Sequence, residues 1–225
     1  MAAKKKSRKT AAPTELPGPP PSRDELLERL QAAIPEPRCE LDHADAYTLL
    51  IATILSAQST DRTVNTVTPT LFAKWPTPAA LAAAPREEVE QVVHKTGFFR
   101  NKAKAIQGAA LAIHQQHGDE VPKDLEALVA LPGVARKTAN VVLGNMWNTP
   151  DGVVVDTHVS RISQKLGLTK GGSAEKIEKD LNAIVPREHW TMLPHWLIFH
   201  GRRVCKARKP DCDNCALYQY CYERA

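Results

Sequence analysis

A lysine and an aspartate stand nineteen positions apart in settings where each could take part in covalent chemistry. Lys137 follows the turn Leu131-Pro132-Gly133-Val134-Ala135-Arg136 and lies at the start of a predicted helix, whereas Asp156 ends an apolar run. An amine there lies at the positive end of the helix dipole, which favours its neutral, nucleophilic form. The turn amides could bind a phosphate, and a carboxylate could move a proton or stabilise a developing cation. The combination indicates covalent chemistry on a nucleic acid.

Each of these residues also has an ordinary structural interpretation. Lysines are common in the first turns of helices, where Lys137 would be a solvated charge. Asp156 precedes Thr157 at a predicted helix start, where an aspartate can accept a hydrogen bond from a free backbone amide. The pair by itself does not decide between structure and chemistry.

The cysteines provide a stronger signal. Cys205, Cys212, Cys215 and Cys221 form the pattern C-x6-C-x2-C-x5-C within the last 21 positions. Four thiolates suit either zinc or an iron–sulfur cluster. Zinc sites usually pair two short C-x2-4-C units, and here only the middle pair has that spacing, so the pattern favours a cluster. Cys39 stands apart, and we expect it to be a small buried apolar residue.

Basic residues surround the cysteine pattern. Arg202 and Arg203 precede it, and Lys206, Arg208 and Lys209 lie between its first two members. Basic side chains near a cluster could offset its negative charge. Those between Cys205 and Cys212 could instead be presented rigidly to phosphates on a loop closed by two ligands, or could simply solvate that loop.

Composition sets broader limits. The 225 residues can bury one sizeable core or two smaller ones. A net charge of +5 and a pI of about 9.0 permit nucleic-acid binding without demonstrating it. The sequence has no apolar run of membrane-spanning length and no secretory signal, so we expect an intracellular protein, in a bacterial cytoplasm rather than a nucleus, without disulfides.

The elements that must position these residues are helical throughout. Residues 1–22 hold five Lys or Arg and five Pro, which predicts a disordered basic tail; it could be a localisation signal, a DNA-tethering arm or only a solvated segment. Apolar periodicity and cap residues predict an all-α fold. Val153 to Val155 has no partner strand and is expected to be an extended connector. Helices are predicted at 22–34, 44–57, 60–73, 102–117, 123–130, 136–147, 157–167, 173–185 and 188–204, and two short helices are predicted to begin at Thr77-Pro78 and at Pro85.

Taken together, these motifs resemble the helix-hairpin-helix/Gly-Pro-Asp superfamily of DNA base-excision glycosylases. The turn at 131–135, Lys137, Asp156 and the four cysteines resemble its iron–sulfur branch, the endonuclease III family. Three further segments agree: Leu55-Ser56-Ala57-Gln58-Ser59-Thr60-Asp61, Lys95-Thr96-Gly97-Phe98 and His195-Trp196-Leu197-Ile198-Phe199-His200-Gly201-Arg202. The match covers about residues 23–225.

The resemblance implies two helical domains with a DNA-binding cleft between them. Residues 39–149 would form a six-helix barrel with the helix-hairpin-helix, and residues 23–38 and 150–225 would form a [4Fe–4S] cluster domain. The partner would be duplex DNA containing damaged bases or abasic sites, bound by a monomer away from any membrane. The cluster ligands would be Cys205, Cys212, Cys215 and Cys221.

The resemblance also implies a mechanism. The damaged nucleotide would be flipped out of the helix. Lys137 would attack C1′ of its sugar, displace an oxidised pyrimidine and form a Schiff base, after which β-elimination breaks the strand. Asp156 would activate the lysine or stabilise the sugar cation.

Several residues are expected to contact DNA in this scheme. Gln58 would fill the gap left by the flipped base, and Phe98 would be a wedge that enters the base stack, although Phe98 or Phe99 could instead pack into the core. The other expected contacts are Gly133, Val134, Ala135, Arg136, His158, Arg208 and Lys209.

Two positions depart from the family pattern. Ala135 stands where the hairpin usually has a second glycine; if that position needs a positive φ, alanine costs about 1 kcal/mol. Phe98 stands where leucine is common, which bears on the choice of lesion and opposite base. Neither departure removes a catalytic group.

Other functions fit parts of the sequence. An adenine-mismatch glycosylase would share the cluster but lacks the lysine nucleophile and carries an extra C-terminal domain. Relatives that act on mismatched thymine or oxidised guanine fit more of the pattern. A non-catalytic DNA-binding or electron-transfer protein would need neither Lys137 nor Asp156.

Overall fold

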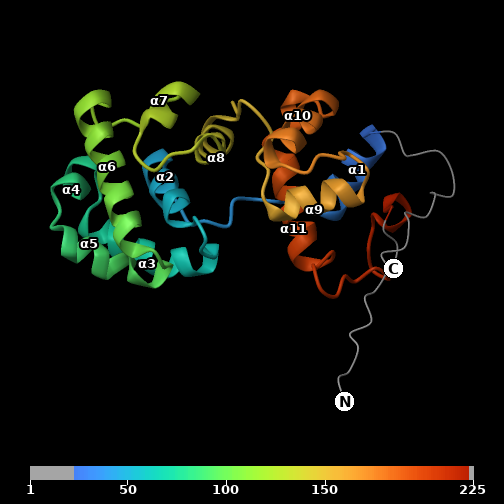
Figure 1. Cartoon of the computed structure of the whole chain (residues 1–225), viewed down its shortest axis with the longest axis horizontal. Coiled ribbons are helices and arrows are strands. Elements are labelled where there is room, and N and C mark those ends of the chain that lie inside the picture. Colours follow the sequence, from blue (N-terminus) through green and yellow to red (C-terminus); the bar gives the residue numbers. More distant parts are fainter. Residues whose placement is uncertain (1–22, 223–225) are drawn as a thin grey trace, which may run out of the picture.

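A computed structural model describes residues 23–222, and all its regular elements are helical (Figure 1), which confirms the all-α prediction for this range. The basic tail predicted for residues 1–22 lies outside the described residues. No helix in the described range is both long enough and apolar enough to cross a bilayer. The α-helices are α1 (Arg23–Ala33), α2 (Ala46–Leu55), α3 (Asp61–Lys74), α4 (Pro78–Ala83), α5 (Arg86–Val93), α6 (Phe99–His117), α7 (Leu125–Ala130), α8 (Arg136–Trp147), α9 (Thr157–Lys165), α10 (Ala174–Ile184) and α11 (Met192–Arg203).

Short polar side chains set many of the helix starts, as the sequence indicates. Thr77 accepts a hydrogen bond from the Ala80 amide ahead of α4, and Asp124 does the same for Ala127 ahead of α7. Two predicted boundaries are wrong. The helix expected from 102 begins at Phe99, and the one expected over 188–204 is a short 3₁₀ turn, Arg187–His189, followed by α11. Residues 153–155 lie in a connector without regular secondary structure and form no strand.

The helices surround two hydrophobic cores. The first is built by α2 to α8 and includes the fully buried Leu50 and Ile106. The second joins Leu30 of α1 to Ile162 of α9, with α10 and α11 completing it. Figure 1 shows the two groups of helices side by side. We propose that these groups correspond to the predicted domains, 39–149 and 23–38 with 150–225.

The chain crosses between the two groups before α2 and again after α8 (Figure 1). Polar contacts accompany the second crossing. The Asp151 amide donates to Asn140 Oδ1 at 2.9 Å, and Thr191 and Asn148 are hydrogen-bonded at 2.8 Å. Hydrogen bonds between polar groups therefore contribute directly to the join between the two groups of helices.

The turn before α8 is fixed by close packing. Gly133 has φ +77°, and a Cβ on it would lie 2.6 Å from the Cβ of Ala105 on α6. Leu131 and Val134 on either side are buried in the first core. By contrast, Ala135 has φ −88° and ψ 163°, an extended conformation open to any residue. The alanine therefore causes none of the backbone strain considered from the sequence.

This packing predicts a large cost for Gly133→Ala. The change adds a steric overlap to an unfavourable φ, so we expect it to lower the free energy of unfolding by about 2–4 kcal/mol. Gly118→Ala is the matched control, because Gly118 also has a positive φ, +60°, but has open space around it. It should cost only about 1 kcal/mol. Equal losses in urea denaturation would show that the Ala105 contact is unimportant.

Candidate active site

Lys137 and Asp156 line one cavity of about 370 Å³. Lys137 is an exposed residue in the first turn of α8, which belongs to the first group of helices, and Asp156 immediately precedes α9 in the second group. The structure thus brings together two residues that the sequence only suggested were related. Gln58 and Ala135 line the same cavity.

The N-terminus of α8 lacks a side-chain cap. Ala135 occupies the cap position and provides no side-chain hydrogen bond. In contrast, Asp, Thr or Ser side chains cap α2, α3, α4, α7, α9 and α10. The first-turn amides beside Lys137 therefore remain available for an anionic ligand such as a phosphate.

Asp156 caps α9, which confirms the interpretation of this residue as a helix cap. Its Oδ1 accepts a hydrogen bond of 2.7 Å from the Val159 amide. A carboxylate has a second oxygen, and Asp156 lines the cavity while it caps α9. The cap fixes the orientation of the carboxylate without using all of its acceptors, so the structural and the chemical interpretation are compatible.

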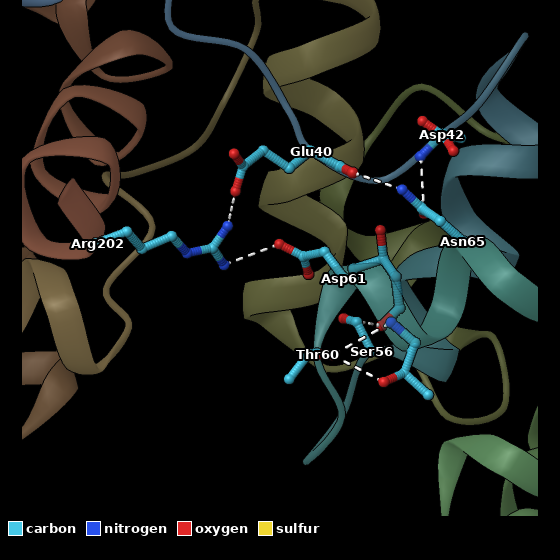
Figure 2. A network of polar contacts seen from close by, with 9 residues as sticks. Glu40, Asp42, Ser56, Thr60, Asp61, Asn65 and Arg202 are labelled. Atoms are coloured by element: carbon cyan, nitrogen blue, oxygen red, sulfur yellow. Dashed lines mark hydrogen bonds and ion pairs between the residues drawn. The ribbon is translucent and has the colours of Figure 1, made fainter.

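A polar network borders this cavity (Figure 2). Arg202 of α11 donates to Glu40 and, at 2.8 Å, to Asp61 at the start of α3. Burial raises the pKa of the Asp61 carboxyl, and the negative charge of Asp156 raises that pKa further. The sequence placed Asp61 and Arg202 within family motifs, and it considered Arg202 only as a basic neighbour of the cysteine pattern. It gave no indication of Glu40.

The predicted wedge residue is exposed. Phe98 has 66% of its surface accessible and a left-handed φ of +46°, directly after Gly97 at φ +71°. Phe99, not Phe98, packs against the first core. The alternative that Phe98 is a core residue is therefore wrong.

A buried lysine holds the turn that carries Phe98. Lys102 Nζ donates to the Thr96 carbonyl at 2.6 Å, and the Lys102 amide donates to the Phe98 carbonyl at 3.1 Å. Burial lowers the pKa of Lys102. This lysine was assigned no function from the sequence, because its spacing does not distinguish it from the exposed lysines near it.

The other predicted DNA-contacting residues differ in their surroundings. The Arg136 guanidinium is paired with Asp151 at 2.9 Å and with Glu178 at 3.1 Å, so in this structure it is engaged in ion pairs within the protein. His158 Nδ1 lies 3.3 Å from the Arg161 guanidinium. Arg208 and Lys209 are exposed and do not line the cavity of Lys137.

The four C-terminal cysteines meet around one small cavity. Cys205, Cys212, Cys215 and Cys221 all line it. Burial raises the pKa of Cys215, and the charges of the other three sulfurs raise it as well, which indicates that the four are close together. Across residues 23–222, however, no three His, Cys, Asp or Glu side chains converge tightly enough to hold a metal ion as they stand. The donor set suits a cluster, and all four donors border the same cavity.

Cys39 is separate from the other cysteines. It is half-buried, packs against the first core, and has its pKa raised by burial.

The sequence and fold match known proteins over most of the chain. Residues 51–187 match the model of the HhH-GPD superfamily base excision DNA repair protein. Endonuclease III of Synechocystis sp. is 51% identical over 88% of this chain and 90% of its own length. Endonuclease III of Escherichia coli strain K12 is 41% identical over 88% of this chain and 93% of its own length.

Solved structures give the same result. A non-covalent endonuclease III–DNA complex has a TM-score of 0.83 at 43% identity and covers 88% of this chain and 92% of that one. A trapped endonuclease III–DNA covalent intermediate has the same TM-score and identity, and the match covers 88% of this chain and 93% of that one. A thermostable thymine-DNA glycosylase, at 20% identity and a TM-score of 0.75, shares the fold.

Proposed function

This chain belongs to the HhH-GPD superfamily of base excision DNA repair proteins, and within it to the endonuclease III family, and we propose that it removes oxidised pyrimidines from duplex DNA as a bifunctional glycosylase and abasic-site lyase. The family makes it a base excision repair DNA glycosylase. The observation that carries the finer proposal is the shared cavity of Lys137 and Asp156. A relative trapped covalently on DNA supports a covalent step.

Lys137 is the nucleophile of the proposed reaction. Its neutral amine attacks C1′ of the flipped nucleotide, the C1′–N bond breaks, and the electron pair leaves with the base, which is protonated. The amine nitrogen gives up one proton, and the C1′–O4′ bond then breaks, with its electron pair taken by O4′, which is protonated. The sugar ring is thereby opened and a protonated Schiff base remains. Loss of a C2′ proton then expels the 3′ phosphate by β-elimination, and water hydrolyses the Schiff base to free the lysine.

Asp156 is the carboxylate that faces this reaction. Its negative charge stabilises positive charge that develops on the sugar, and it can accept a proton from the attacking amine. The α9 cap holds the carboxylate in place before substrate binds, so no reorganisation is needed. The uncapped amides of α8 hold the backbone phosphate next to the lesion.

Gln58 and Phe98 fit the task of keeping the nucleotide out of the stack. Gln58 is exposed at the cavity edge with φ +54°, and Phe98 projects from the Lys102-anchored turn. An exposed phenyl ring can stack on a base, a contact of about 1–3 kcal/mol. We propose Gln58 as the gap-filling residue and Phe98 as the wedge, in a monomer bound to damaged duplex DNA.

We further propose that Cys205, Cys212, Cys215 and Cys221 hold a [4Fe–4S] cluster. Their common cavity supports this assignment. The cluster would hold together the C-terminal loops, because it ties four points of the chain to one centre. The loop between Cys205 and Cys212 would then present Arg208 and Lys209 to the DNA backbone.

The nucleophile assignment predicts a covalent adduct. Borohydride should trap the protein on duplex DNA that contains thymine glycol or an abasic site, and Lys137→Gln should abolish the adduct because an amide cannot form a Schiff base. The adduct is measured by its retarded migration on a denaturing gel. Trapping that survives the substitution would refute Lys137 as the nucleophile.

The carboxylate assignment predicts a selective loss of rate. Asp156→Asn keeps an oxygen for the α9 cap but removes the charge, so base release should slow by roughly 100-fold while DNA affinity and thermal unfolding change little. Single-turnover kinetics give the rate. A variant that unfolds at a clearly lower temperature would indicate that the aspartate serves chiefly as a cap.

The cofactor assignment predicts a brown protein that contains iron and sulfide. Cys212→Ala should lose the colour and the iron because it removes one of four thiolates. Cys39→Ala is the matched control and should keep both, since Cys39 lies outside the cavity of the four cysteines. Colourless native protein with one zinc ion would overturn the assignment.

A further inference from the structure

The two proposed catalytic residues depend on different hydrophobic cores. Lys137 is carried by α8 of the first group, and Asp156 is carried by α9 of the second. Residues 148–156 join these helices by a short connector without regular structure. The distance between amine and carboxylate is therefore set by whatever holds the two groups of helices together.

Arg202 makes two polar contacts across this join. It lies in the last turn of α11, which packs against α9. Its Nη1 donates to Glu40 Oε2, and its Nη2 donates to Asp61 Oδ2 at 2.8 Å. Figure 2 shows the guanidinium reaching from one group of helices to two acids of the other. These side chains are 37%, 36% and 25% exposed for Arg202, Glu40 and Asp61, so water competes only partly for the pairs.

The two acids are held together as one unit. Asn65 of α3 donates to the Glu40 carbonyl at 2.8 Å, and its Oδ1 accepts from the Asp42 amide at 3.0 Å. The segment that carries Glu40 is thus fastened to the helix that begins with Asp61 (Figure 2). An arginine bound to both acids is held at two points, which restrains its rotation as well as its distance.

The contact lies at the edge of the catalytic cavity. Glu40, Asp61, Asp156 and Arg202 line the cavity of Lys137 and also a neighbouring cavity of about 670 Å³. Three of these four residues are acids, and Arg202 provides the positive charge among them. The bridge of Arg202 to Glu40 and Asp61 therefore lies where the two groups of helices meet beside Asp156.

We propose that Arg202, Glu40 and Asp61 form an interdomain clasp that sets Asp156 opposite Lys137. Arg202 is a positioning residue in this assignment: it acts through α11 and α9 and touches no reacting atom. An arginine suits this bridge, because its planar guanidinium holds two separate donors in a fixed geometry, one for each acid. The inference rests on the proposed function, in which base release uses both Lys137 and Asp156.

The clasp predicts unequal losses in the two chemical steps. Base release needs both catalytic residues, whereas strand cleavage at a preformed abasic site depends chiefly on the lysine. Arg202→Met removes the clasp but keeps a side chain of similar length. We expect it to slow base release from a thymine-glycol duplex by roughly 10- to 100-fold, and to slow cleavage of an abasic-site duplex clearly less.

Arg203→Met is the matched control. Arg203 is the adjacent arginine in the same helix, and its Cζ lies 4.2 Å from the centre of the Phe199 ring. Arg203 lines neither of the two cavities. It should keep the native ratio of the two rates. Visible absorbance and thermal unfolding of each full-length protein show whether the cofactor and fold are retained. Equal slowing of both steps by Arg202→Met, or no slowing, would overturn the clasp.

Two further variants keep the test decisive if Arg202→Met does not fold. Arg202→Lys retains the charge but can reach one acid well at a time, so base release should fall to an intermediate rate. In a protein with Glu40→Gln and Asp61→Asn, Arg202→Lys should add little further loss, because the partners of the arginine have been weakened. Full additivity would show that Arg202 acts independently of these acids.

The outcomes for the clasp and for the proposed function are distinguishable. Native protein that forms no borohydride adduct would overturn the lysine mechanism itself. Native protein that forms the adduct while Arg202→Met releases base at the native rate would overturn the clasp alone.

Discussion

The proposed nucleophile and its carboxylate belong to helices that pack into separate hydrophobic cores, and the arrangement of the site depends on how those cores are joined. Apolar packing fixes each helix within its own group, with Ile106 buried in one and Ile162 in the other. Between the groups, a fully apolar interface would fill the space that the proposed mechanism needs for a flipped nucleotide. Arg202, Arg136 and Asn140 instead join the groups through charged and polar contacts that leave a cavity lined by Lys137 and Asp156.

Polar contacts of this kind bring their own electrostatic cost. Asp61 and Asp156 lie close enough that the charge of Asp156 contributes to the raised pKa of Asp61. The guanidinium of Arg202 donates to Asp61 and so puts a positive charge beside that carboxyl. The same acids would repel DNA phosphates, so the cavity suits a sugar that develops positive charge better than it suits the phosphate. The phosphate is matched instead by the uncapped start of α8.

Local backbone conformation controls the parts that would meet DNA. Gly133 needs both its positive φ and its missing Cβ, because α6 passes directly behind the turn. Phe98 has the less usual combination of a bulky side chain and a left-handed φ. The buried Lys102 stabilises that turn by donating to the Thr96 carbonyl, so a buried polar side chain supports an exposed aromatic one. The two turns are therefore stabilised in different ways. The turn at Gly133 is held by close packing against α6, and the turn at Phe98 is held by the buried Lys102.

The sequence by itself determined the helical fold, most helix boundaries and the residue types capable of chemistry. Helix caps and apolar periodicity involve residues only a few positions apart, so they can be recognised from the sequence. Thr77 and Asp124 are examples of such caps. The sequence did not predict the start of α6, because the turn at Gly97 and Phe98 lies before the stretch with apolar periodicity. It also suggested backbone strain at Ala135, but the backbone there is extended and unstrained. Only the tertiary structure placed Arg202 against Glu40 and Asp61, partners 162 and 141 positions away. The physical reason is that a contact between side chains this distant depends on how two separately packed cores are oriented, and no local pattern of residues records that orientation.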